Sequence, residues 1–257
     1  MSRALILMYH LVDTPRSQKE HRFCTTPDDF AGQIAHLAAS GYTPLSMAQL
    51  CDCMQGKTPM PDKAVHITFD DGFTCVLDHA APILQRYLFP ATMFALSDRL
   101  GSTNDWMTSR GFPERAILSA TGLHALEEAG FTIGSHTRTH VRLPDIPEEE
   151  ALDEIRGSKS RLEDALGKAV AYFAYPYGRF SEPVRELVAD AGYQAACSTR
   201  SGFNRPGEDP YLLRRIDIFG TDRLWQFKQK LQFGTNEASL TYPLRYLARR
   251  VIARLVE

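Results

Sequence analysis

The chain has 257 residues, of which 44% are hydrophobic, 23% charged and 10% aromatic. This composition is typical of a globular protein and excludes a disordered, collagenous or membrane-embedded chain. The formal net charge is −2, from 29 basic and 31 acidic residues, so no overall field draws the chain to nucleic acid. A chain of this length can bury one large core without disulfides or metals to hold it.

The five cysteines indicate a reducing compartment. Their number is odd, no Cys-x-x-Cys spacing occurs, and Cys51 and Cys53 are too close for an ordinary structural disulfide. The apolar run at residues 4–8 has no small-residue cleavage site after it, which favours a first strand over a signal peptide. No apolar run reaches the roughly 20 residues that span a bilayer. We therefore expect a cytoplasmic protein.

Short apolar runs alternate with amphipathic segments along the chain. We expect strands over residues 4–8, 64–69, 91–96, 131–135, 171–175, 194–198 and 211–218. We expect helices over residues 27–40, 46–54, 73–88, 119–129, 147–167 and 181–191, and a long loop over residues 97–118. This alternation predicts an α/β protein with a parallel sheet or barrel in one domain, residues 1–220, followed by a helical extension, residues 221–257.

Two polar motifs follow predicted strands and contain metal-ligand side chains. Asp70 and Asp71 come directly after the strand 64–69, and His136 and His140 follow the strand 131–135 at i, i+4 spacing, which we expect on one helical turn. Parallel strands bring their carboxyl ends to one face of a barrel, so Asp71 and both histidines can converge on one ion. Taken alone, the first motif could be a helix-capping turn and the second a pair of surface histidines.

Two further motifs complete the set. Tyr175-Pro176-Tyr177-Gly178 follows the strand 171–175, and its proline and glycine can shape a loop that points a backbone N–H into a pocket. His10 ends the first strand. One aspartate and two histidines leave open metal positions for water, and the remaining Asp70 and His10 could then act as base and acid.

Together these motifs resemble those of the polysaccharide deacetylases of the NodB-homology type, carbohydrate esterase family 4. TFDDG at residues 68–72, SHTRTH at 135–140 and YPYG at 175–178 are similar to the first three family motifs. MYH at residues 8–10 resembles the poly-N-acetylglucosamine deacetylase branch, in which a permuted sheet places a histidine near the N-terminus. The resemblance covers nearly all of residues 4–218 and implies a distorted (β/α)7 barrel.

The resemblance also implies a role for each motif residue. A divalent metal, zinc first and nickel or cobalt as alternatives, would be held by Asp71, His136 and His140. The general base would be Asp70, the general acid His10, and the oxyanion donor the backbone N–H of Tyr177.

The sequence departs from the family pattern at two places. An arginine usually stands two residues before the proline of the third motif and steadies the base, but Ala174 occupies that position. The usual C-terminal Leu-x-His motif is also absent, since His140 is the last histidine. Either His10 is then the acid, which fits the permuted branch, or the enzyme lacks one; Arg214 or Arg215 could replace the missing arginine.

The implied activity is metal-dependent removal of an N-acetyl group from an amino-sugar glycan or glycolipid precursor. A cytoplasmic enzyme would meet a lipid-linked or nucleotide-linked sugar. Two alternatives remain: a deformylase or other non-sugar C–N hydrolase on the same barrel, and a catalytically dead carbohydrate-binding protein. Neither alternative implies a nucleic-acid partner.

Aromatic residues near the motifs could stack on sugar rings. The candidate substrate-binding residues are Trp106 in the long loop, Tyr9, Tyr175 and its neighbour Pro176. The end of the chain, residues 240–257, has leucines and valine on one helical face and arginines on the other. Such a basic amphipathic segment could lie on the inner membrane face as a peripheral contact, or pack on the barrel.

Overall fold

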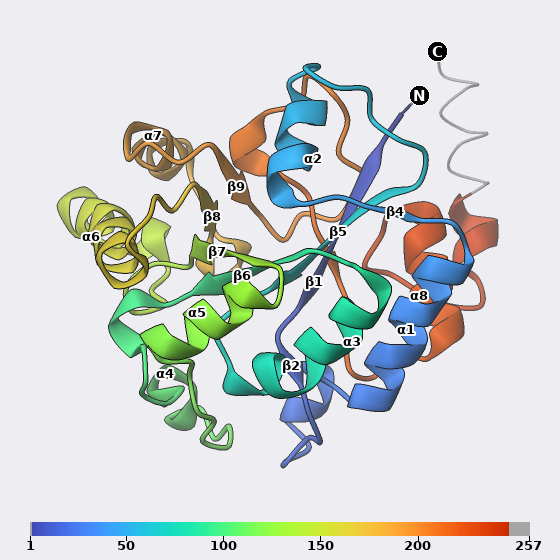
Figure 1. Cartoon of the computed structure of the whole chain (residues 1–257), viewed down its shortest axis with the longest axis horizontal. Helices are drawn as coiled ribbons and strands as arrows, with labels where there is room; N and C mark the ends of the chain where they lie inside the picture. Colours follow the sequence, from blue (N-terminus) through green and yellow to red (C-terminus); the bar gives the residue numbers. More distant parts are fainter. Residues whose placement is uncertain (1, 247–257) are drawn as a thin grey trace.

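The computed structural model describes residues 2–246, and its centre is a curled sheet of parallel strands (Figure 1). The strand order is β10-β1-β5-β6-β7-β8-β9. A single parallel bridge between Cys197 and Leu213 joins the two edges of the sheet, so the strands form a distorted seven-stranded barrel. The barrel strands are β1 (Ala4–Tyr9), β5 (Ala64–Phe69), β6 (Ala91–Ala95), β7 (Phe131–Ser135), β8 (Tyr172–Ala174), β9 (Ala195–Cys197) and β10 (Ile216–Asp217). The predicted α/β class and barrel are confirmed.

Helices surround the barrel and cover its outer face (Figure 1). They are α1 (Pro27–Ala39), α2 (Met47–Met54), α3 (Ala81–Tyr87), α4 (Asp105–Thr108), α5 (Ala120–Glu128), α6 (Glu148–Leu166), α7 (Glu182–Asp190) and α8 (Leu224–Phe233). Helix α6 follows its sequence signals closely, with three glutamates in its first turn and Gly167 in a left-handed conformation (φ 67°) at its end.

Alternate residues of each strand face different cores, because successive side chains of a strand point to opposite faces. In β1, Leu5, Leu7 and Tyr9 belong to the main core beneath the surrounding helices. Ala4 and Ile6 face the barrel interior, where α2 packs against its amino-terminal end. The next interior position after Met8 is His10, so the same alternation brings that histidine to the carboxyl-terminal end of the barrel.

The structure contains short elements that the sequence patterns did not predict. Two parallel two-residue strands, β2 (Leu11–Val12) and β3 (Cys24–Thr25), pair beside the barrel mouth, and β4 (Thr43–Pro44) pairs with the start of β5. Single 3-10 turns occupy Glu20–Arg22, Ser97–Arg99, Leu143–Asp145, Pro176–Gly178 and Pro210–Leu212. Elements of two or three residues are too short to leave a periodic signal.

The helix expected over residues 73–88 is interrupted. A π-helical turn, Val76–Ala80, precedes α3, and the N–H of Ala81 bonds to the carbonyl of Val76. Pro82 explains the wider turn, because it has no N–H to donate to the carbonyl of Asp78 in a regular α-helix. The expected strand 211–218 is also shorter, since Pro210–Leu212 form a 3-10 turn and only Ile216–Asp217 pair with β1.

Helix α8 packs on the barrel assembly itself. Phe227 and Leu231 belong to the same core cluster as Phe30, Ile34 and Leu37 of α1. The domain division at residue 220 stays a prediction. Within the described residues, no helix is long and apolar enough to cross a bilayer. The expected C-terminal amphipathic helix falls mostly on residues 247–257, which lie outside the described part.

Candidate active site

A cavity of about 270 Å³ opens at the carboxyl ends of β1, β5, β7 and β8. In a parallel barrel this is the end where side chains from several strands can act together. The loop 97–118 forms one wall of the cavity, and the motif residues form its floor. The lining includes His10, Phe23, Asp70, Asp71, Trp106, Met107, Arg110, Phe112, His136, His140, Tyr177 and Asp217.

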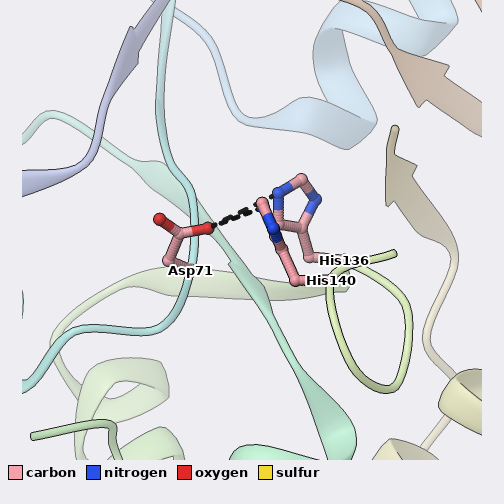
Figure 2. Close-up of side chains that lie close together, drawn as sticks. All are labelled: Asp71, His136 and His140. Atoms are coloured by element: carbon pink, nitrogen blue, oxygen red, sulfur yellow. Dashed lines mark ion pairs between the residues drawn. The ribbon is translucent and has the colours of Figure 1, made fainter. Parts of the chain in front are cut away.

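The predicted metal ligands lie together on this floor. Asp71 Oδ1 is 3.2 Å from Nε2 of His140 and 3.6 Å from Nε2 of His136 (Figure 2). One ligand atom from each of the three buried residues lies within 4.8 Å of the others. His136 bonds through Nδ1 to the carbonyl of Ala174 at 2.7 Å, so Nδ1 holds the proton and Nε2 presents its lone pair to the cluster.

The loop conformation that gathers these ligands is unusual. Thr137 and His140 have left-handed backbone angles (φ 72° and 68°), as do Asp71 (76°) and Tyr177 (56°). They are four of the six non-glycine residues with positive φ in residues 2–246. The expected helical turn over the two histidines is therefore wrong: a strained loop makes them converge. Such strain concentrates at functional sites.

The electrostatics of the cluster fit a divalent cation. Asp71 Oδ1 and His140 Nδ1 are buried and have no hydrogen-bond partner in the described structure. Burial alone would raise the pKa of Asp71, but His140 and the other nearby imidazoles hold that pKa below its ordinary value. Burial lowers the pKa of His136 to about 4, so its ring is neutral and able to ligate at neutral pH.

Asp70 is fixed by Arg215, which directly precedes β10, two strands away from β5 in the sheet. Arg215 donates to both carboxylate oxygens of Asp70, at 2.6 Å and 2.8 Å, and its Nε donates to the carbonyl of Ser198. Burial raises the pKa of Asp70, but Arg215 and then His136 outweigh it and keep the carboxylate ionised. Of the two arginines that the sequence offered in place of the family arginine at Ala174, the structure selects Arg215.

His10 lines the same cavity as the predicted metal ligands, with its ring 5.6 Å from that of Phe23. Asp217, which the sequence analysis did not single out, lines the same cavity. Its backbone is held by Asn236 and Lys230, while its Oδ1 has no hydrogen-bond partner in the described residues. Burial raises the pKa of Asp217, and the nearby His10 counteracts this effect. The sequence feature that could have pointed to Asp217 is its position at the end of the predicted strand 211–218.

The candidate substrate residues divide into two groups. Trp106 lines the cavity, with its ring 5.5 Å from that of His140. The prediction that Tyr9 and Tyr175 bind substrate is wrong. Both are fully buried in the main core, where the hydroxyl of Tyr9 bonds to Gln33 and that of Tyr175 to the carbonyl of Tyr211. Neither ring can contact a substrate. Pro176 is buried and shapes the turn without lining the cavity.

A parallel barrel with three convergent metal-ligand side chains and a second, tethered carboxylate at the carboxyl ends of its strands has an architecture that suits a hydrolase. The family model for polysaccharide deacetylase matches residues 57–196, which is more than half of the chain. The chain therefore belongs to the polysaccharide deacetylase family, whose enzymes are hydrolases acting on acetylated carbohydrates. This confirms the family that the motifs TFDDG, SHTRTH and YPYG indicated.

Relatives and solved structures agree with this assignment. A poly-beta-1,6-N-acetyl-D-glucosamine N-deacetylase of Staphylococcus epidermidis is 26% identical over 78% of this chain and 70% of its own length. The fold matches that of IcaB from Ammonifex degensii with a TM-score of 0.78, at 23% identity over 91% of this chain and 97% of that one. It also matches the Streptococcus pyogenes deacetylase PplD, with a TM-score of 0.76 at 24% identity, over 90% and 98% of the two chains.

Proposed function

We propose that the protein is a metal-dependent N-deacetylase that hydrolyses the acetamido group of an N-acetylated amino sugar in a glycan or a lipid-linked precursor. The observation that supports this most strongly is the pairing of the Asp71–His136–His140 cluster with a separately tethered carboxylate, Asp70, in one cavity. The S. epidermidis relative, named for poly-β-1,6-N-acetylglucosamine, supports the amino-sugar substrate.

We propose zinc as the bound ion, with nickel or cobalt as alternatives. Two imidazole nitrogens and one carboxylate oxygen are a ligand set that zinc commonly takes in catalytic sites, where a further position stays open. When bound there, the ion would polarise the acyl oxygen and lower the pKa of its water toward neutrality.

Asp70 is placed to receive the proton of the attacking water. Both of its oxygens accept from Arg215, and each keeps a second lone pair for the incoming proton. Because Arg215 keeps Asp70 ionised, the base is ready at neutral pH. Proton transfer of this kind typically contributes about 10²- to 10⁴-fold to the rate.

Tyr177 supplies an N–H for the developing oxyanion. Tyr177 lines the cavity and has a left-handed backbone (φ 56°), a conformation that can direct its N–H toward the acyl oxygen. A donor already in place costs no reorganisation when charge develops on the acyl oxygen. The turn also needs Gly178, because a Cβ there would lie 1.9 Å from Oγ1 of Thr199.

His10 is the proton donor to the leaving amine, and Asp217 is its partner. Both line the cavity, and Oδ1 of Asp217 has no hydrogen-bond partner within the described residues. A carboxylate facing an imidazole stabilises the protonated ring and fixes its orientation. The amine of an amide is a poor leaving group, so its departure requires this proton.

The walls of the cavity suit one acetamido sugar. Trp106, Met107, Phe23 and Phe112 supply apolar surface around the polar floor. Aromatic faces pack well against the C–H faces of a sugar ring and can bury an acetyl methyl group.

The direct test is acetate release from N-acetylglucosamine oligosaccharides by the zinc-loaded protein. We expect turnover by the wild-type chain and almost none by Asp70→Asn, with Asp28→Asn on the exposed surface of α1 as the matched control. Formate release from N-formyl substrates, without acetate release, would support the deformylase alternative. Metal binding and sugar binding without any hydrolysis would support a carbohydrate-binding protein.

We further propose that the protein works in the cytoplasm, with a peripheral contact to the inner membrane through residues 240–257. All five cysteines are buried and free, which agrees with a reducing compartment. Leu240 and Leu244 are exposed beside Arg245 at the start of this segment. Vesicle flotation with anionic lipids should recover the full chain but not a chain ending at residue 239. Equal recovery of both would contradict the contact.

A further inference from the structure

Arg110, which lines the cavity, and a second arginine, Arg142, both lie close to the ring of one cavity residue, Tyr177. The guanidinium carbon of Arg142 lies 4.9 Å from the ring centroid of Tyr177, and that of Arg110 lies 5.9 Å from it. Tyr177 is 37% exposed and both arginines are exposed. Within residues 2–246, neither arginine forms an ion pair with a carboxylate, unlike Arg138 and Arg185. Their positive charge is therefore available to a ligand.

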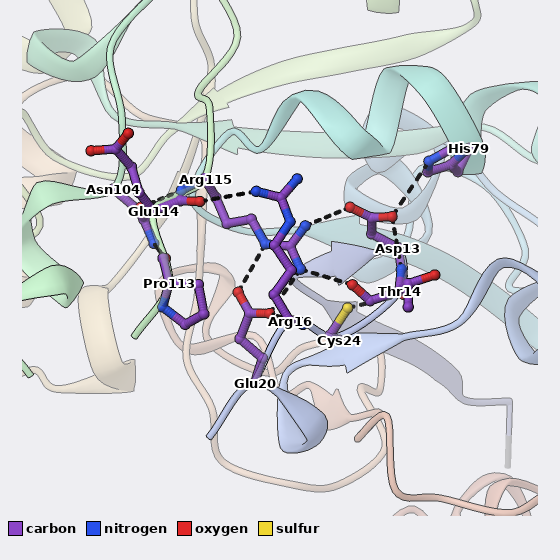
Figure 3. A network of polar contacts seen from close by, with 10 residues as sticks. All are labelled: Asp13, Thr14, Arg16, Glu20, Cys24, His79, Asn104, Pro113, Glu114 and Arg115. Carbon is purple, nitrogen blue, oxygen red and sulfur yellow. Dashed lines mark hydrogen bonds and ion pairs between the residues drawn. The ribbon is translucent and has the colours of Figure 1, made fainter. Parts of the chain in front are cut away.

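The loop that places Arg110 is held firmly to the body of the protein. Buried Arg115 donates to both carboxylate oxygens of Glu20, at 2.8 Å and 2.7 Å, and to Asp13 at 2.5 Å (Figure 3). Lys19 adds a bond of 2.7 Å to the carbonyl of Arg110 itself. Lys19 holds the carbonyl of Arg110, and Arg115 anchors the segment that follows it. Arg110 therefore has a fixed position at the cavity.

Arg142 is placed by the second motif. It follows His140 by two positions and precedes Leu143, which is 1% exposed in the main core and anchors the segment. The ring of Tyr177 meets that of His140 edge-on, with the two centroids 4.5 Å apart, so Tyr177 contacts both a predicted metal ligand and the two guanidinium groups. An anionic group bound at the arginines would thus be separated from an acyl group at the cluster by the ring of Tyr177.

The charges inside the cavity do not cancel the positive charge of these arginines. Of the four carboxylates that line the cavity, Asp70 is paired with Arg215 and Glu20 with Arg115, while Asp217 forms no ion pair within the described residues. Asp71 would be neutralised by the cation that its cluster fits. A cleft whose inner charges are mostly compensated and that is flanked by positive side chains attracts anionic ligands.

We propose that Arg110 and Arg142 form an anion-recognition site, and that the natural substrate is an amino sugar with a phosphate or carboxylate on the same or the adjoining sugar. The inference rests on the proposed deacetylase function and narrows its substrate class. A guanidinium group presents a planar fork of N–H donors that matches the oxygens of phosphate and carboxylate. A neutral glycan offers no such group.

The test compares three substrates that differ only in charge. They are a neutral β-linked N-acetylglucosamine disaccharide, the same disaccharide with a 1-phosphate, and one in which the second sugar is glucuronate. We measure kcat/KM for acetate release by the zinc-loaded full chain, for wild type, Arg110→Gln, Arg142→Gln and the double variant. Arg156→Gln, an exposed arginine of α6, is the matched control.

We expect wild type to prefer at least one anionic substrate over the neutral one. Arg110→Gln and Arg142→Gln should each lower that preference by about three- to tenfold, mainly through KM, and the double variant by more. Added salt should lower it in wild type. The control should keep the wild-type ratio. A preferred phosphate identifies a phosphorylated substrate, and a preferred glucuronate a carboxylated one.

Equal kcat/KM on all three substrates would overturn the inference, and so would a preference that Arg110→Gln and Arg142→Gln leave unchanged. Failure of the underlying function would look different, since no acetate would be released from any of the three. The two failures are therefore distinguishable in one set of assays.

Discussion

Arg215 and Asp70 lie 145 positions apart in the chain, yet the arginine donates hydrogen bonds to both oxygens of the carboxylate. The bond connects the residue just before β10 to the residue just after β5, and only β1 lies between these two strands in the sheet. Arg215 is completely buried. Each charge of the pair compensates the other, because either charge buried alone would destabilise the fold. We regard Arg215 as a positioning residue that acts through Asp70.

Replacing Arg215 by lysine should keep the positive charge but remove the paired hydrogen bonds to the two carboxylate oxygens of Asp70. We expect kcat for acetate release to fall about 10- to 100-fold, and the acidic limb of the kcat–pH profile to move to higher pH. The sign follows from the structure: Arg215 lowers the pKa of Asp70, so a weaker partner lets that pKa rise. A lower kcat with an unmoved acidic limb would mean that Arg215 only supports the fold.

Removing the proposed acid should affect amides and activated esters differently. We expect His10→Ala to lower hydrolysis of an N-acetyl sugar by about 10²- to 10⁴-fold, because the amine leaves only when protonated. Hydrolysis of 4-nitrophenyl acetate should fall far less, since nitrophenolate needs no proton. Asp217→Asn should show the same pattern more weakly. Equal losses on both substrates would argue against an acid role for His10.

His66 should make the metal-free protein sensitive to acid. Its buried ring bonds to the carbonyl of Leu45 and to Thr92, and burial lowers its pKa to about 4. The unfolded chain takes up the proton near pH 6.5, so the native state loses stability as the pH falls from about 6.5 to 4, by up to about 3 kcal/mol. His66→Gln should reduce this loss in urea unfolding with a chelator present. An unchanged pH dependence would contradict the assignment.

The motif residues could be predicted because each follows an apolar strand, and parallel strands deliver their ends to one face. The sequence could not show how the loop at Thr137 and His140 bends, since left-handed angles in non-glycine residues leave no periodic signal. Choosing Arg215 over Arg214 likewise required the register of β10 beside β1.

The errors at Tyr9 and Tyr175 have a simple origin in strand alternation. Tyr9 shares its face with Leu5 and Leu7, and Tyr175 follows the same alternation as Phe173, so both point outward to the helices. A position next to a motif in the sequence does not by itself bring a side chain into the cavity. Counting positions along each strand would have excluded both residues and favoured His10.

The most direct test of the account is the metal content of the chain after loading with zinc and removal of excess ion. We expect one tightly bound divalent ion per chain in wild type and in Asp70→Asn, and little or none in His136→Ala or His140→Ala. Circular dichroism should show that the variants remain folded. Zinc binding by folded His136→Ala equal to that of wild type, or no binding by wild type, would contradict the proposed metal centre.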